Sequence, residues 1–169
     1  MVFERLRKIV DAKLAKLGLK INYKLCGTKH DSVTEEIRNT IHLNPKDSKS
    51  SALAAQNMQH LLLHEIGHIL VRTKIPVKIK RNQKVMALFG DLIKRYRRRQ
   101  GRIQASPDFI SNYAQVQPRD DFCETFAVYA NLDGDIRKIR AFLKKRGKGP
   151  KVLKKVLWIS RTVKNIANI

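Results

Sequence analysis

The sequence predicts an α+β fold that is mainly helical, with one small sheet, in a single domain. Several stretches repeat apolar residues at three- and four-residue steps, which is the spacing of an amphipathic helix. Two short stretches within residues 19–45 alternate apolar and polar residues, as half-buried strands do. The chain of 169 residues suits one domain with a hydrophobic core, and it holds no repeat and no long linker.

The first part of the chain predicts one helix and then the sheet. Residues 1–18 place leucine and valine on one face between charged residues, and Gly18 ends the run. Residues 19–45 predict the small sheet, because "LKINYKL" and "EIRNTIHLNP" each alternate apolar and polar side chains. The stretch "CGTKHDS" between them predicts a turn.

The rest of the chain predicts helices. A long, continuously apolar helix is expected at the centre of the domain, and Pro118 suits the first turn of a later one. Basic helices close the chain over residues 134–169. The predicted helices after the sheet cover residues 51–73, 84–100, 119–132, 136–145 and 152–166.

The charge of the chain is strongly positive. Lysine and arginine total 36 against 14 acidic residues, a formal net charge of +22. Such a charge either keeps a small protein soluble or attracts nucleic acid or another polyanion. Only 7% of the residues are aromatic, which disfavours a protein that reads bases by stacking.

The cysteines and the hydropathy indicate an intracellular protein. Cys26 and Cys123 lie far apart without a paired zinc-thiolate spacing, so we expect two small buried side chains and no disulfide framework. No stretch approaches the roughly 18 apolar residues of a membrane span. The N-terminus lacks the apolar centre of a secretory signal, so we expect a cytoplasmic location.

The stretch "LLLHEIGHILVRT" carries a candidate metal site. On a helix, His64 and His68 project from one face and can bind one ion. Glu65 lies beside them, and zinc brings the pKa of a bound water towards neutral so that a carboxylate can take its proton. This is the H-E-x-x-H pattern of zincins, and it predicts one Zn²⁺ per chain.

A catalytic zinc needs a third protein ligand, and the sequence points to a carboxylate. None of the five histidines follows His68, so families that draw a third histidine from downstream are disfavoured. The expected helix at 119–132 carries Asp120, Asp121 and Glu124, any of which can ligate the metal. Asp120 and Glu124 share one face, so one can ligate while the other bonds a ligand histidine.

Together, "HEIGH" and "FISNYAQVQPRDDFCETFA" resemble the gluzincin metallopeptidases, particularly the compact single-domain ones and the lethal-factor-type catalytic domain. The resemblance implies that Tyr113 steadies the oxyanion and can donate a proton. It further implies that Asp120 is the third ligand and that Glu124 lies behind the ligands. The family usually has glutamate where this chain has Asp120. Either the helix therefore sits closer to the metal, or Glu124 or Asp121 ligates instead.

The same resemblance implies a zincin-like architecture. An edge strand would border the cleft above the active-site helix, and "NTIHLNP" suits that strand, to which an extended substrate could add. His60, four residues before His64, is expected at the surface or behind the ligands.

The expected function is a zinc-dependent endopeptidase acting on a protein or peptide, with Glu65 and Tyr113 as catalytic residues. The alternative is a basic nucleic-acid-associated protein with a structural or vestigial zinc site. It rests on "KIKRNQK", "KRYRRRQGR" and "KKRGKGPKVLKK". The two combine in a peptidase that acts on nucleic-acid-bound proteins.

Overall fold

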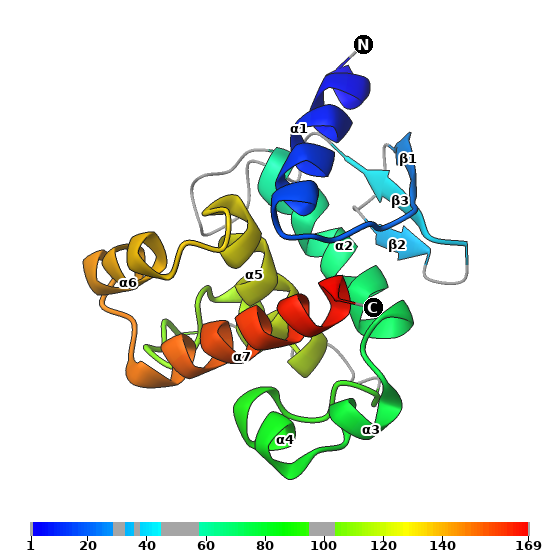
Figure 1. The fold of residues 1–169 in the computed structure, drawn as a ribbon. Helices are drawn as coiled ribbons and strands as arrows, with labels where there is room; N and C mark the ends of the chain where they lie inside the picture. Colours follow the sequence, from blue (N-terminus) through cyan, green and yellow to red (C-terminus); the bar gives the residue numbers. More distant parts are fainter. Residues whose placement is uncertain (1, 29–32, 36–37, 45–57, 95–103, 169) are drawn as a thin grey trace.

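The structure is a computed structural model that describes residues 2–28, 33–35, 38–44, 58–94 and 104–168. The predicted α+β fold, mainly helical with a small sheet, is confirmed (Figure 1). Helix α2 contacts α1, two strands and helix α5, and α5 contacts α7 in turn. In the described part of the chain, no helix combines the length and apolar character that a membrane span requires.

Helix α1 (Val2–Lys16) buries Val10 and Leu14 and ends at Gly18, whose φ of 70° favours glycine. Strand β1 (Lys24–Gly27) begins five residues later than the alternation predicts. The backbone N–H of Leu19 instead donates to the Leu14 carbonyl at 2.9 Å. The first residue of the predicted strand is therefore bonded to the end of α1 rather than to a neighbouring strand.

Among the described residues, the sheet has three strands in the order β1-β3-β2. β3 (Thr40–Leu43) pairs in parallel with β1 and antiparallel with β2 (Val33–Glu35). The prediction that "NTIHLNP" forms the edge strand beside the site is wrong, because β3 is the central strand and β2 is the edge strand that contacts α2. With three residues, β2 is too short to show an alternation of its own.

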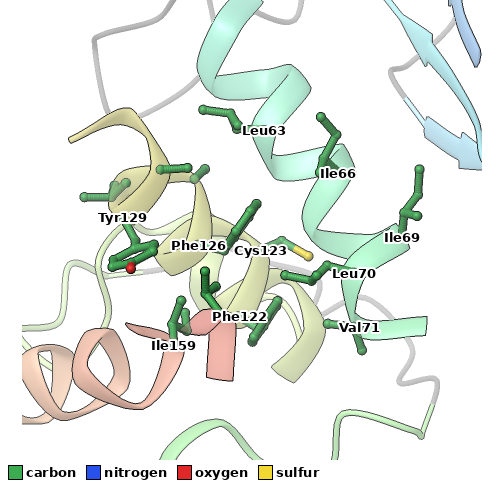
Figure 2. Close-up of a cluster of buried hydrophobic side chains, with 14 of the residues drawn as sticks. Leu63, Ile66, Ile69, Leu70, Val71, Phe122, Cys123, Phe126, Tyr129 and Ile159 are labelled. Atoms are coloured by element: carbon green, nitrogen blue, oxygen red, sulfur yellow. The ribbon is translucent and has the colours of Figure 1, made fainter. Parts of the chain in front are cut away.

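The core is built where α2 (Met58–Thr73) packs on α5 (Pro118–Asn131), and Figure 2 shows the apolar side chains between them. The first residues predicted for the α2 helix, 51–57, lie outside the described residues. A Cβ placed on Gly67 would lie 3.0 Å from both Cα and Sγ of Cys123. The absence of a side chain at Gly67 therefore allows α5 to pack closely against α2.

Two short helices, α3 (Val77–Lys80) and α4 (Gln83–Phe89), follow α2. The helix predicted for residues 84–100 ends at Phe89, because Gly90 takes a φ of 87°. A side chain at Gly90 would collide with Pro118, and the Arg119 side chain donates to the carbonyls of Leu92 and Ile93. Residues 91–94 are not helical, and the backbone N–H groups of Ile93 and Lys94 donate to Asp91 Oδ1 instead. The rest of the predicted helix, residues 95–100, lies outside the described residues.

The chain closes with α6 (Ile136–Lys145) and α7 (Pro150–Ala167). α7 buries a charged residue, Lys155, against α5. The Lys155 ammonium donates to Asp121 Oδ2 at 2.6 Å and to the Asp108 carbonyl at 2.8 Å. Burial raises the pKa of Asp121 to about 7, although the charge of Lys155 opposes that rise. The pair thus joins α7 both to the start of α5 and to the segment before it.

We expect Lys155→Met to cost about 3–5 kcal/mol of unfolding free energy, because it leaves the Asp121 carboxylate buried without its cation. The double variant Asp121→Leu/Lys155→Met should be much closer to the wild type, because both buried charges are gone. Urea denaturation of the three proteins measures this. Equal losses in the single and double variants would contradict the charge-pair explanation.

Candidate metal centre

Helix α2 presents His64 and His68 to α5. The two rings lie 5.1 Å apart between centroids in an edge-to-face arrangement, as residues four apart on one helix face do. His64 is buried, while His68 is partly exposed. The pair therefore has one side against the protein core and one side towards solvent.

Asp120, in the first turn of α5, brings a carboxylate to both rings. Its Oδ1 lies 3.5 Å from His68 Nε2 and 3.9 Å from His64 Nε2. Donor atoms on a tetrahedral zinc lie roughly 3.4 Å apart, given metal–ligand distances of about 2.1 Å. Both distances from Asp120 to the histidine nitrogens are thus close to the spacing between two ligands of one zinc ion. The close approach of α5 at Gly67 lets the short aspartate side chain reach the histidines.

Glu124, one turn further along α5, binds the other nitrogen of His64. Its Oε1 accepts from His64 Nδ1 at 2.8 Å, and its Oε2 accepts from the Ser111 hydroxyl at 2.7 Å. A proton on Nδ1 leaves the Nε2 lone pair of His64 on the side of Asp120. This is the arrangement in which a carboxylate orients a metal-binding histidine.

His60 extends this network behind the pair. Its Nε2 lies 3.3 Å from Glu124 Oε1, and its Nδ1 lies 3.2 Å from the Asn131 side-chain nitrogen. Because the amide nitrogen of Asn131 can only donate, the His60 proton lies on Nε2 and points to Glu124. His60 was expected either at the surface or behind the ligands. It is buried, so the surface position is wrong.

The network sets the charges of its members. Burial would raise the pKa of Glu124, but the bonds from His60 and His64 hold that pKa well below its ordinary range. Burial likewise would lower the pKa of His64, but Glu124 and the nearby Glu65 and Asp120 raise it to about 9. The buried site is therefore rich in negative charge, which a cation would balance.

Glu65 lies next to the pair and is held from the sheet. The Thr34 hydroxyl of β2 is 2.6 Å from Glu65 Oε2 and 3.2 Å from the Glu65 carbonyl oxygen. The carboxylate is buried, and its charge acts on His64. No sequence pattern indicated this contact, because Thr34 and Glu65 are 31 residues apart.

Tyr113 borders the site from the short 3₁₀ helix η2 (Tyr113–Gln115). Its ring centroid lies 5.4 Å from that of His64, and 41% of the residue is exposed. Ser111 accepts from the Ala114 N–H at 3.1 Å while it donates to Glu124. One serine, which the sequence did not single out, therefore ties the turn that carries Tyr113 to α5.

Cys123 offers a second candidate set of ligands. Its Sγ and ring nitrogens of His64 and His68 all lie within 4.8 Å of one another, so the three residues could hold a metal ion. Cys123 is buried, as expected, whereas Cys26, for which burial was also expected, is only partly buried. Burial raises the pKa of the Cys123 thiol well above the ordinary value. Figure 2 shows it on the side of α5 that faces α2. Cys123 lies three residues after Asp120, so on a helix both residues are near the same face, and this spacing could have marked Cys123 as a candidate ligand.

Asp121 does not share the environment of Asp120. Neighbouring residues on a helix point about 100° apart, so with Asp120 towards α2, Asp121 turns towards α7 and binds Lys155. Asp121 was expected among the residues at the metal site, as a possible ligand, whereas in the structure its carboxylate pairs with Lys155.

The comparisons with known proteins agree with this chemistry. A family model described as "Putative zinc-binding metallo-peptidase" matches residues 54–159. No curated protein and no solved structure matches the chain. The matched segment spans more than half of the chain and includes both histidines, Asp120 and Glu124. The chain belongs to this family of zinc-binding metallo-peptidases.

Proposed function

We propose that the protein is a zinc-dependent endopeptidase of the gluzincin type, in which His64, His68 and Asp120 hold one zinc ion. The observation that carries the proposal is the position of Asp120 Oδ1, within 3.5 and 3.9 Å of the two Nε2 atoms. Two neutral imidazoles and one carboxylate leave a fourth position for water, as in catalytic zinc sites. Cys123, the other candidate, belongs in this proposal to the packing of α5 on α2.

The side chains around the ligands suit peptide hydrolysis. Zinc, when bound, activates a water and polarises the substrate carbonyl. Glu65 would take the proton from the attacking water and pass it to the leaving amine. Tyr113 is partly exposed and its ring lies beside that of His64, so its hydroxyl would donate a hydrogen bond to the negative charge that develops on the carbonyl oxygen. Glu124 keeps His64 in the orientation that ligation requires.

Strand β2 is the proposed place for the substrate main chain. In the described sheet β2 pairs only with β3, and it contacts the helix that carries the histidines. An extended peptide could pair with the other side of β2. The scissile bond would then lie close to Glu65, which β2 contacts directly.

Replacing Glu65, the proposed general base, tests catalysis separately from metal binding. Glu65→Gln should keep about one zinc per chain, because Glu65 is not a ligand, and should lower hydrolysis by about 10²–10⁴-fold. Elemental analysis and a quenched fluorescent peptide library measure the two quantities. Normal cleavage by this variant would refute the proposed mechanism.

Two single replacements decide between the candidate ligand sets. Asp120→Ala should weaken zinc binding by more than the roughly 10–100-fold typical of changes behind the ligands. Cys123→Ala, the matched control three residues along the same helix, should leave zinc affinity near that of the wild type. Competition with a chromogenic chelator measures both affinities. The opposite ranking would assign the metal to His64, His68 and Cys123.

A second candidate function, binding of nucleic acid, is favoured by the surface of α6. This helix buries Ile139 and Leu143, and it exposes lysine and arginine on the rest of its surface. The exposed basic residues at this end are Arg137, Lys138, Arg140, Lys144, Lys145 and Arg146. Such a row would bind phosphates without reading bases, which fits a peptidase that acts on nucleic-acid-bound proteins.

The α6 surface is tested by charge reversal at matched positions. Lys138→Glu/Lys144→Glu should weaken DNA or RNA binding and reduce the slope of log affinity against log salt by about 2. Arg5→Glu/Lys8→Glu on α1 makes the same change in net charge and should have a smaller effect. Fluorescence anisotropy across a salt series measures both. Equal effects would point to overall charge instead of α6.

A further inference from the structure

We propose that Thr34 is a positioning residue that fixes the Glu65 carboxylate for catalysis and links it to the substrate-binding strand. The inference rests on the proposed peptidase function. Thr34 is the middle residue of β2 and stands opposite Ile41 in the antiparallel register with β3. Directly paired residues share one face of a sheet, and Ile41 is fully buried. The Thr34 side chain therefore points inward, towards α2.

The Thr34 hydroxyl has one proton and two oxygen neighbours on Glu65. Oε2 lies at 2.6 Å and the backbone carbonyl oxygen at 3.2 Å. The shorter contact is to the charged group, and charge-assisted hydrogen bonds are the stronger kind, so the proton lies towards Oε2. This hydrogen bond holds Oε2 of Glu65 in place. The other carboxylate oxygen, Oε1, takes no part in the bond and is the one proposed to accept a proton from water.

Helix geometry alone does not aim Glu65. It is one residue past His64, about 100° around α2 from that ligand, so its carboxylate needs an external contact to hold one direction. A β-branched threonine supplies that contact with a stiff χ1 torsion. The identity of the residue therefore matters as well as its hydroxyl.

The position of Thr34 also couples substrate binding to the base. A peptide that paired with the outer side of β2 would order the strand from which Thr34 reaches Glu65. Substrates that extend along β2 should therefore raise the turnover rate through Thr34, in addition to binding more tightly.

The test compares Thr34→Val, which keeps the shape and removes the hydroxyl, with Thr34→Ser, which keeps the hydroxyl. Thr40→Val on the central strand is the control. We expect Thr34→Val to lower kcat by on the order of tenfold or more with little change in KM or zinc content. Thr34→Ser should restore most of kcat, and Thr40→Val should match the wild type. Unchanged kcat in Thr34→Val, or equal losses in the Val and Ser variants, would overturn the proposal.

A stability cycle tests the same contact without activity. In metal-free protein, Thr34→Val should raise the unfolding equilibrium constant severalfold, and much less in a Glu65→Ala background, where the carboxylate is absent. Additive losses would overturn the Thr34–Glu65 link. A wild-type chain that shows this coupling but no zinc-dependent hydrolysis would refute the peptidase function and leave the contact established.

Discussion

The contact between α2 and α5 at Gly67 and Cys123 is the constraint on which the site depends. A glycine on one helix lets the backbone of the other approach closely, and this distance decides what side chains can reach across. Asp120 then meets the imidazole Nε2 atoms, and Glu124 meets His64 from behind. A wider spacing would require a side chain longer than aspartate, such as glutamate. The close packing of α2 on α5 and the presence of an aspartate at position 120 therefore depend on each other.

Sequence reasoning succeeded where a single helix determines the geometry. The spacing of His64 and His68, and that of Asp120 and Glu124, follows from helical periodicity, so each pair could be placed on one face before any fold was known. The choice between Asp120 and Asp121 required the neighbours of α5. Both are acidic residues in a first turn, where the helix dipole favours either. Only the positions of α2 and α7 distinguish them.

The contacts that sequence reasoning missed join segments far apart in the chain. Thr34 reaches Glu65 from a three-residue strand, and Ser111 reaches Glu124 from an irregular segment. Neither segment has a periodicity that would draw attention. The early end of α4 has a similar origin, because Gly90 packs against Pro118, 28 residues later. A hydropathy pattern indicates which face of a helix or strand is buried. The contacts of Thr34, Ser111 and Gly90 depend instead on which elements pack together.

The two neighbouring aspartates of α5 point about 100° apart around the helix and contact different elements, α2 and α7. Asp121 has its charge balanced by Lys155, a partner supplied by the protein itself. The start of α5 is therefore anchored whether or not a cation is bound beside Asp120. Chelation should consequently empty such a centre without melting the domain, and reloading would need no refolding. Such behaviour would distinguish this chain from small zinc modules, which lose their fold together with their ion.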